Sequence, residues 1–424
     1  MMKATWPKVK LADCVNLLAG FAFKSQQFTD KPDDVPLVKG ENVSQGCILW
    51  DISKRWPSSD WEKLEKFHLV PGDVVLAMDR PWIPAGLKWS YIRAGDPKAL
   101  LVQRCARLRS SNGLLDQDFL RFVIGGPGFE SYIVPITTGV NVPHISGQQI
   151  LDFEFTLPPL PVQQRIAGIL SAYDELMENS QRRIRLLEAM ARALYREWFV
   201  HFRFPGHEKL PRIASPLGDI PQGWEVKRMP ECVDISPRVS VPRDGEKPFV
   251  PMGCLSNDSM LISDIESRAG NSGAKFQNGD TLFARITPCL ENGKTGFVQF
   301  LPDAQSVAFG STEFIVLRSR TLTPEFVYLL ARSDEFRGVA IKSMSGATGR
   351  QRVQEKCFDD FQIVQAPRAL LDRFSAIVAP SFRLIYKLHL QIQNLRRTRD
   401  LLLPRLLSGQ VNLSTLTKNT EGQS

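Results

Sequence analysis

The stretch LPPLPVQQRIAGILSAYDEL, residues 157–176, decides the fold because it joins a proline-rich corner to a long helical pattern. Proline fixes φ and donates no backbone hydrogen bond, yet the first turn of a helix tolerates it well. Pro161 is therefore expected to start a helix that continues far beyond residue 176. With a rise of about 1.5 Å per residue, a helix from about 163 to 199 is roughly 55 Å long.

This helix carries an apolar seam whose spacings alternate strictly between four and three residues, and a second seam with the same alternation lies near the end of the chain. Such a heptad pattern needs a partner helix with a similar seam, and the simplest partner for each helix is the other. Ser180 and Arg399 interrupt the pattern and are expected to help fix its register. The predicted seam residues are Ile166, Leu170, Tyr173, Met177, Ile184, Leu187, Leu194 and Trp198 in the first helix, and Leu371, Phe374, Val378, Ile385, Leu388, Ile392, Leu395, Leu402 and Leu406 in the second.

The two seams belong to a repeat that covers most of the chain. PGDVVLAMDRPWIPAG (71–86) aligns with NGDTLFARITPCLENG (278–293) at an offset of 207 residues. The same offset places DQDFLRFV (116–123) over TPEFVYLL (323–330), and both blocks fall in short predicted helices. Further along, an offset of 208 residues sets Phe153 on Phe361 and Pro159 on Pro367. Three aligned blocks in one order indicate a duplicated chain. Each copy has a mixed segment with short strands, followed by one long helix.

The predicted fold class is α+β, with two mixed α/β domains separated by two long helices that form an antiparallel coiled coil with pseudo-twofold symmetry. The seams alone allow parallel or antiparallel pairing, and the antiparallel arrangement is preferred because it explains why a globular segment precedes each helix. Pro380 and Pro404 are expected to kink or end the second helix. The predicted boundaries are 1–158 and 206–366 for the globular domains, 159–205 and 367–410 for the helices, and 411–424 for a flexible tail.

Composition sets broad limits on the kind of protein. The 424 residues carry a net charge of +8 with a pI near 9.1, which suits a polyanionic partner but is also common without one. Seven scattered cysteines have no zinc-ligand spacing, so reduced thiols in a cytoplasmic protein are expected. We find no targeting signal and no apolar run of the roughly 18 residues that a membrane span needs.

A search for catalytic motifs finds no enzyme site. The phosphate-loop, HExxH, GxSxG and GxGxxG patterns are absent. Gly125, Gly126 and Gly128 are interpreted as a plain loop, because a probable helix and not a strand precedes them. Asp73 and Asp280 occupy matching Gly-Asp turns and are interpreted as turn formers rather than catalytic acids. Core packing is the preferred role for the tryptophans of the first mixed segment, which are Trp50, Trp56, Trp61, Trp82 and Trp89.

Several stretches together resemble the specificity subunit of type I restriction-modification systems. They are GFAFKSQQF (20–28), ITTGVNVPHISGQQILDFEFTLPPLPVQQRI (136–166) and LLLPRLLSGQV (401–411), in an order that spans nearly the whole chain. The second junction, VQAPRALLDRFSAIV (364–378), departs from the pattern because it lacks the QQR triplet. Residues 234–255 match the start of a second recognition domain only loosely.

The resemblance implies two target-recognition domains, each of which reads one half of a bipartite DNA sequence. The helices would act as a spacer and would dock two methyltransferase (modification) subunits, with motor-nuclease (restriction) subunits joining for restriction. S-adenosylmethionine would bind to the modification subunit, so this chain would need no cofactor, no metal and no membrane, and would be non-catalytic. Two alternatives stay open: a stand-alone methyltransferase or nuclease with diverged motifs, and a coiled-coil adaptor that binds only proteins.

DNA recognition needs phosphate contacts for affinity and base-edge contacts for sequence choice, and basic and amide side chains in the matched loops supply both. The predicted DNA-binding residues are Lys24, Lys39, Asn42, Arg80, Asn141 and His144 in the first domain, and Arg285, Thr287, Lys294, Thr348, Arg350 and Arg352 in the second. Arg350 and Arg352 are the preferred candidates, because SGATGRQR (345–352) brings glycine and arginine together.

Overall fold

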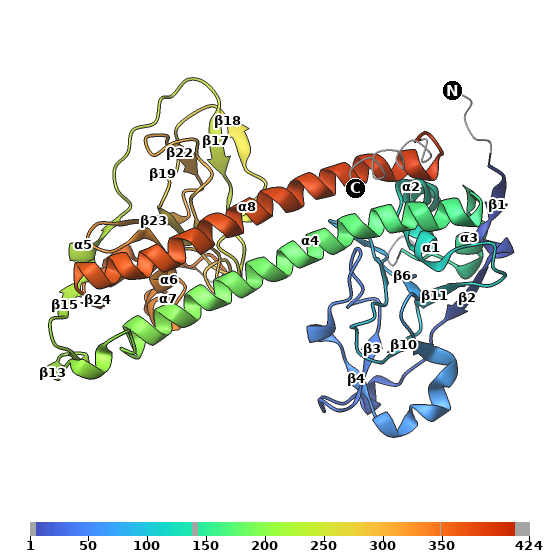
Figure 1. Ribbon diagram of the computed structural model, residues 1–424, viewed down its shortest axis with the longest axis horizontal. Helices are drawn as coiled ribbons and strands as arrows, with labels where there is room; N and C mark the ends of the chain where they lie inside the picture. The colour runs from blue at the N-terminus through green and yellow to red at the C-terminus, as the bar shows by residue number, and fades with distance from the viewer. Residues whose placement is uncertain (1–5, 138–142, 348, 412–424) are drawn as a thin grey trace, which may run out of the picture. The chain divides into compact units, whose positions relative to one another are not determined.

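The computed structural model of the chain describes residues 6–137, 143–347 and 349–411 (Figure 1). It contains two compact units: unit 1 comprises Met1–Leu176 with Leu395–Ser424, and unit 2 comprises Met177–Asn394. The two long helices, α4 (Leu160–Tyr195) and α8 (Arg368–Leu407), each contribute to both units. Of the predicted tail, all but Val411 lies outside the described residues.

Unit 1 contains two four-stranded sheets and two two-stranded ones. The antiparallel sheet has the order β2 (Val15–Ala19), β11 (Cys105–Ser110), β6 (Val74–Ala77) and β9 (Trp89–Tyr91). The mixed sheet has the order β4 (Arg55–Trp56), β3 (Val35–Val38), β10 (Ala99–Leu101) and β5 (His68–Leu69), with β3 and β10 parallel. The remaining pairs are β1 (Lys8–Lys10) with β12 (Glu154–Thr156), and β7 (Trp82–Ile83) with β8 (Gly86–Leu87).

Unit 2 repeats the strand order and directions of both four-stranded sheets, which confirms the duplication. Its antiparallel sheet has the order β16 (Val233–Ile235), β23 (Phe314–Ser319), β20 (Thr281–Ala284) and β21 (Thr295–Phe297). Its mixed sheet has the order β18 (Glu266–Arg268), β17 (Lys247–Val250), β22 (Ala308–Gly310) and β19 (Ala274–Phe276), and β17 and β22 are the parallel pair. The remaining pairs are β15 (Glu225–Arg228) with β24 (Gln362–Gln365), and β13 (Arg212–Ser215) with β14 (Gly218–Pro221).

Two short helices of each unit correspond, α1 to α6 and α2 to α7, and the two predicted from sequence are present as α1 and α6. Each begins at a side-chain cap, where Asp116 accepts from the Phe119 N–H and Thr323 accepts from the Phe326 N–H. Gly125 and Gly126 lie in the short connection between α1 and α2, as expected, but the loop interpretation is wrong for Gly128, which lies in the first turn of α2. A Cβ on Gly125 would collide with the Trp89 ring. The short helices are α1 (Gln117–Ile124), α2 (Pro127–Ile136) and α3 (Gly147–Leu151) in unit 1, and α5 (Met229–Cys232), α6 (Pro324–Ala331) and α7 (Asp334–Lys342) in unit 2.

The long helices pair in opposite directions within each unit, which confirms the antiparallel coiled coil. In unit 1, Arg399 near the end of α8 donates from Nη1 to Asp174 of α4 at 2.7 Å. In unit 2, the Phe374 ring near the start of α8 lies 5.9 Å from Trp198 and 4.9 Å from Phe199, just beyond the end of α4. Residues early in one helix therefore contact residues late in the other. In Figure 1 the two helices are drawn in green and red.

Every predicted seam residue is buried or half-buried. The globular parts supply some of this burial: Phe382 of α8, for example, packs edge-on against Tyr328 of α6 at 5.5 Å. Contrary to one expectation, α8 continues through both Pro380 and Pro404, so neither proline ends the helix. Each proline removes only one backbone hydrogen bond, and the buried side chains around them, such as Val378 and Phe382, hold the helix in place.

The first glutamine of the QQR triplet ties the start of α4 to the start of α1. The Gln163 side chain is fully buried, and its Oε1 accepts from the Asp116 N–H at 2.8 Å. Its Nε2 donates to the carbonyls of Leu114 at 2.8 Å and Pro158 at 2.7 Å. In the second copy the aligned residue is Leu371, also fully buried, so an apolar contact replaces this polar junction.

The remaining general expectations concern cysteines, membranes and metals. All seven cysteines are free thiols, and burial raises the pKa of Cys105 to about 12 and that of Cys14 to about 11. Among the described residues, no helix combines the length and apolar character needed to cross a membrane. In the same residues, no group of His, Cys, Asp and Glu side chains is arranged to hold a metal ion.

Candidate nucleic-acid interface

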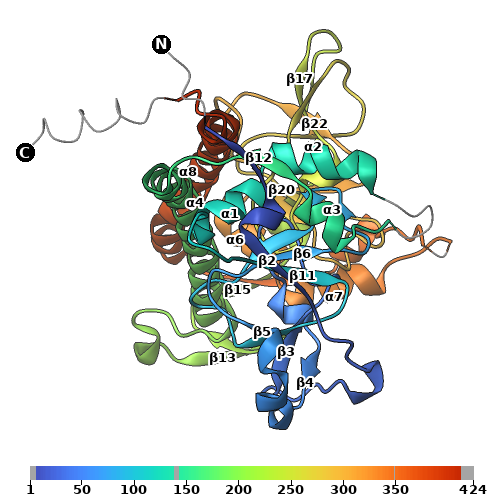
Figure 2. The same cartoon turned by 90° about the vertical axis from the view of Figure 1, so that its right-hand side faces the viewer.

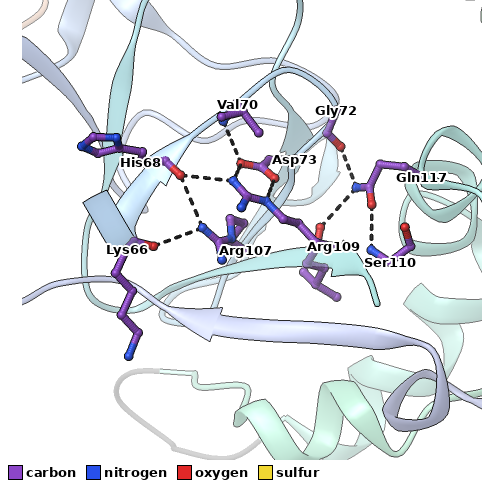
Figure 3. Close-up of polar contacts among 10 residues, drawn as sticks. Lys66, His68, Val70, Gly72, Asp73, Arg107, Arg109, Ser110 and Gln117 are labelled. Atoms are coloured by element: carbon purple, nitrogen blue, oxygen red, sulfur yellow. Dashed lines mark hydrogen bonds and ion pairs between the residues drawn. The ribbon is translucent and has the colours of Figure 1, made fainter. Parts of the chain in front are cut away.

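A buried ion pair fixes the turn before the central strand of each unit (Figure 3). Arg109 donates from Nε and Nη2 to the Asp73 carboxylate, with Nη2 and Oδ2 2.7 Å apart, and the Val70 N–H donates to the same carboxylate at 2.8 Å. Arg318 and Asp280 form the same bidentate pair in unit 2, with both distances 2.7 Å. The predicted turn-forming role of the two aspartates is confirmed, and the arginines add a role that the sequence did not reveal.

The loop after β6 is held by three backbone hydrogen bonds. The Met78 N–H donates to the Arg104 carbonyl, the Ile145 N–H to the Met78 carbonyl, and the Arg80 N–H to the Pro143 carbonyl, each at 2.8 Å. These contacts join three segments that are distant in sequence. We call residues 78–80, 104 and 143–145 the loop cluster of unit 1.

The loop after β20 is held by the same three contacts. The Arg285 N–H donates to the Glu313 carbonyl at 3.0 Å, the Val353 N–H to the Arg285 carbonyl at 2.8 Å, and the Thr287 N–H to the Gln351 carbonyl at 3.1 Å. Residues 285–287, 313 and 351–353 are therefore the loop cluster of unit 2. The matching bonds make Arg352 the counterpart of His144, and Glu313 the counterpart of Arg104.

Both loop clusters place a planar nitrogen donor against a carboxylate at the surface. In unit 1, His144 Nδ1 lies 2.5 Å from Asp79 Oδ1, and Arg104 Nη1 lies 3.0 Å from the other oxygen of that carboxylate. In unit 2, Arg352 donates to Glu313 from Nε at 2.9 Å and from Nη2 at 2.6 Å. The side chains of His144 and Arg352 are 43% and 46% exposed, so both are accessible. The Arg352 guanidinium holds the pKa of Glu313 below its usual range.

Several predicted DNA-binding residues come together in these clusters, and others do not. The residues in or beside the clusters are Arg80, His144, Arg285, Thr287, Arg350 and Arg352. Lys24 is exposed in a separate loop, and Lys39 pairs with Glu41 at 3.1 Å. Asn141 and Thr348 lie outside the described residues.

Asn42 uses its polar group inside the protein, which corrects the expectation that it faces DNA, and two further predicted residues are half-buried with partners inside the chain. Asn42 is 1% exposed, and its amide bonds the Lys39 N–H and the Leu37 carbonyl. Arg285 binds Glu355 at 3.0 Å, and Lys294 donates to the Met252 carbonyl at 3.0 Å. Burial and internal hydrogen bonds leave the Asn42 amide unavailable to a ligand, whereas the sequence shows only its polarity.

Sequence reasoning missed three charged residues of the clusters, namely Asp79, Arg104 and Glu313. A signal for them was present, because CARLRS (105–110) aligns with FIVLRS (314–319) at an offset of 209 residues. That alignment matches Arg109 with Arg318 and places Arg104 over Glu313, with opposite charges at one position. The two copies therefore share a backbone but carry different functional groups on it.

The comparisons with known proteins agree with this architecture. Residues 3–189 match the family model described as the type I restriction modification DNA specificity domain. The specificity subunit of the type I restriction enzyme MjaIX from Methanocaldococcus jannaschii is 25% identical over 312 residues, which are 70% of each chain. The specificity subunit of EcoAI from Escherichia coli is 32% identical over 177 residues, 42% of this chain and 29% of that one.

The family model and these relatives support the interpretation of the chain as a type I specificity subunit. A solved structure shares its fold: the S subunit of a type I restriction-modification system from M. genitalium superimposes with a TM-score of 0.59 at 14% identity, covering 95% of this chain and 96% of that one. The similarity to these specificity subunits supports a non-catalytic role and assembly with other subunits of a restriction-modification complex and with DNA.

Proposed function

We propose that the globular part of each unit reads one half of a bipartite DNA sequence, and that the paired helices set the spacing between the half-sites. The observation that supports this most directly is the duplicated loop cluster. One backbone arrangement presents His144, Asp79 and Arg104 in unit 1, but Arg352 and Glu313 in unit 2. Two copies of one scaffold with different surface donors suit a protein that reads two different half-sites.

The chemistry of the exposed residues fits this role. Arginine and lysine supply the phosphate contacts that dominate affinity, and planar donors supply base-edge contacts in the major groove. Exposed Arg80, Arg350 and Lys24 suit the first task. His144 and Arg352, which are held by carboxylates on a fixed backbone, suit the second.

The partner subunits follow from the same proposal. Two modification subunits would dock along α4 and α8 and would bring S-adenosylmethionine and the methyl-transfer chemistry, and restriction subunits would join them in the cytoplasm. Leu186 and Met190 of α4 are 57% and 67% exposed, and they offer apolar contacts one helical turn apart for such docking. The boundaries 1–158 and 206–366 for the recognition domains, and 159–205 and 367–410 for the spacer, belong to this proposal.

Methylome sequencing tests the proposal directly. The chain is expressed with the modification subunit of its own system in a host that lacks methylation, and a parallel culture lacks the chain. We expect methylated adenines in one split motif only when the chain is present. Methylation without the chain, or at an unsplit motif, would contradict the proposal.

Incubation of the purified chain alone with DNA and labelled S-adenosylmethionine separates this function from a stand-alone methyltransferase. We expect no methyl transfer until the modification subunit is added. Retention of a duplex with the split motif, but not of a scrambled duplex, by the complex at moderate salt distinguishes it from a protein-only adaptor.

A further inference from the structure

The ion pair between Arg352 and Glu313 leaves part of the arginine unused. A guanidinium has five N–H donors in a planar fork, and Glu313 accepts from Nε at 2.9 Å and from Nη2 at 2.6 Å. Within residues 6–137, 143–347 and 349–411, Nη1 has no hydrogen-bond partner. In this described part of the chain, the two N–H groups of Nη1 and the second N–H group of Nη2 therefore remain as free donors at the end of the guanidinium, while Glu313 binds its Nε edge.

The backbone that carries Arg352 is fixed on both sides. The Arg352 N–H donates to the Ser345 carbonyl at 2.9 Å, and the Ser345 N–H donates back at 3.1 Å. The next residue, Val353, is buried, and its N–H donates to the Arg285 carbonyl at 2.8 Å. Arg352 therefore projects a half-exposed side chain from a strand-like segment that is clamped in place, and Glu313 restricts its remaining rotamers.

Stability does not explain the pair well. Arg352 and Glu313 are 46% and 21% exposed, and ion pairs at such exposed sites contribute little to stability. The carboxylate also comes from different positions in the two units, from the loop after β6 for Asp79 and from the turn before β23 for Glu313. In both units it contacts the side chain at the position of Arg352 and His144. The two units therefore share the position of the side chain that is held, which is His144 or Arg352, although the carboxylate that holds it comes from different segments.

The chemistry of the unused fork indicates what it binds. Guanine presents the O6 and N7 acceptors side by side in the major groove, and a bidentate arginine is the commonest specific partner for them. A phosphate would also accept from arginine, but the nearby negative charge of Glu313 disfavours phosphate contact in general. A carboxylate that holds an arginine in one orientation lowers indiscriminate binding and favours a defined acceptor pair.

We propose that Arg352 reads a guanine in the half-site bound by unit 2, and that Glu313 is the positioning residue that directs its guanidinium fork at the base. This inference rests on the proposed function, since it names a contact within one of the two half-sites. His144 occupies the equivalent place in unit 1, so the other half-site is read independently of Arg352.

The test uses the full chain with its modification subunit, and duplexes that carry the split motif or single base-pair substitutions in it. Arg352→Ala is expected to lower discrimination at one G·C pair about 5- to 150-fold and to leave the other half-site unchanged. Arg352→Lys keeps the charge without the fork and is expected to lose discrimination at the same pair. The methylome motif should become degenerate at that one position.

Glu313→Gln tests the positioning role. It is expected to reduce discrimination at the same G·C pair by a smaller factor, and the double variant with Arg352→Ala should be no worse than Arg352→Ala alone. The matched controls are Glu266→Gln and Arg268→Ala, which break an exposed Arg–Glu pair of the same unit and should leave the motif intact.

Three outcomes overturn different parts of the inference. If Arg352→Ala weakens binding equally for all sequences and reduces the salt dependence by about one phosphate, Arg352 contacts the backbone and not a base. If Glu313→Gln leaves discrimination unchanged, the positioning role is wrong while the Arg352 contact stands. Failure of the wild-type complex to methylate any split motif would reject the proposed function itself, which is a separate result.

Discussion

Asp73 is a buried carboxylate whose charge is balanced by a single guanidinium. Its side chain is 1% exposed, and Arg109 holds it through two hydrogen bonds while the Val70 N–H supplies a third (Figure 3). Removing one partner of a buried pair leaves the other charge uncompensated, and this usually costs more than the intact pair contributes. Asp280 and Arg318 form the equivalent pair in unit 2, so removing either partner should leave an uncompensated charge there as well.

The first prediction concerns this pair. Asp73→Asn should lower the free energy of unfolding of unit 1 by roughly 2–3 kcal/mol. This is less than the roughly 3–5 kcal/mol for breaking a fully buried ion pair, because the Arg109 side chain is about a third exposed. Chemical denaturation of the full chain, followed by tryptophan fluorescence, measures the change. Glu266→Gln, in an exposed ion pair, serves as the control and should cost less than about 0.5 kcal/mol. Equal effects of the two variants would show that burial of the pair does not matter.

Gln163 carries the second prediction at this scale. Its buried side chain hydrogen-bonds three backbone groups, so Gln163→Ala should destabilise unit 1 by about 1–3 kcal/mol. Gln163→Leu, which copies Leu371, should not restore stability, because an apolar side chain leaves the same backbone groups unpaired. Gln164→Ala is the matched control at an exposed neighbour, and thermal unfolding of the three variants provides the comparison. Full stability of Gln163→Leu would contradict this role.

At the scale of elements, local sequence patterns predicted the helices but not the pairing of strands. The heptad seam predicted α4 and α8 because helix periodicity is visible within the segment itself. Strand neighbours are set by contacts distant in sequence, such as β1 with β12 and β15 with β24. The run FIVLRS predicted β23 as a strand, whereas nothing in it shows that Arg318 binds Asp280, 38 residues earlier.

The two copies also differ in an element that sequence comparison did not predict. In unit 1, Leu37 and Leu100 of the mixed sheet are buried beneath Phe23 and Leu64. The equivalent residues of unit 2, Phe249 and Phe309, instead line an open hollow of about 650 Å³. Figure 2 labels strands of both mixed sheets, β3 and β4 in unit 1 and β17 and β22 in unit 2. In unit 1 the covering residues come from a loop, for Phe23, and from the 3-10 helix Glu62–Phe67, for Leu64. Neither segment has a hydrophobic periodicity, so the sequence did not predict that one sheet is covered and the other is open.

The third prediction concerns the pairing of α4 with α8 in unit 1. Asp174→Arg places like charges opposite each other at Arg399 and should destabilise this end of the helix pair by about 1–2 kcal/mol. The exchanged pair, Asp174→Arg with Arg399→Asp, should recover most of the loss because it restores opposite charges. Glu175→Arg is an exposed neighbouring control. A double variant no more stable than the single one would indicate that the contact does not fix the register.

At the scale of the whole molecule, duplication was the most informative sequence signal. It predicted two similar domains and two helices, and the matching sheet orders confirm it. The candidate site was only partly predictable. Alignment placed Arg80, His144, Thr287 and Arg352 in matched loops, but the carboxylates that hold two of them come from elsewhere in the chain. Burial also removed Asn42 from the surface, which polarity alone could not reveal.

The last prediction tests whether the helices determine the spacing between half-sites. Seven residues, one heptad, are inserted after Ser180 in α4 and after Gln393 in α8, each six residues from the Asp174–Arg399 ion pair. One heptad preserves the phase of both seams and lengthens each helix by about 10 Å, which corresponds to roughly three base pairs. Methylome sequencing should show both half-sites unchanged and a gap longer by about three base pairs. A four-residue insertion at the same places, which shifts the seam phase, serves as the comparison and should impair methylation more. Altered half-site sequences would contradict the spacer role, because the insertions leave both loop clusters untouched.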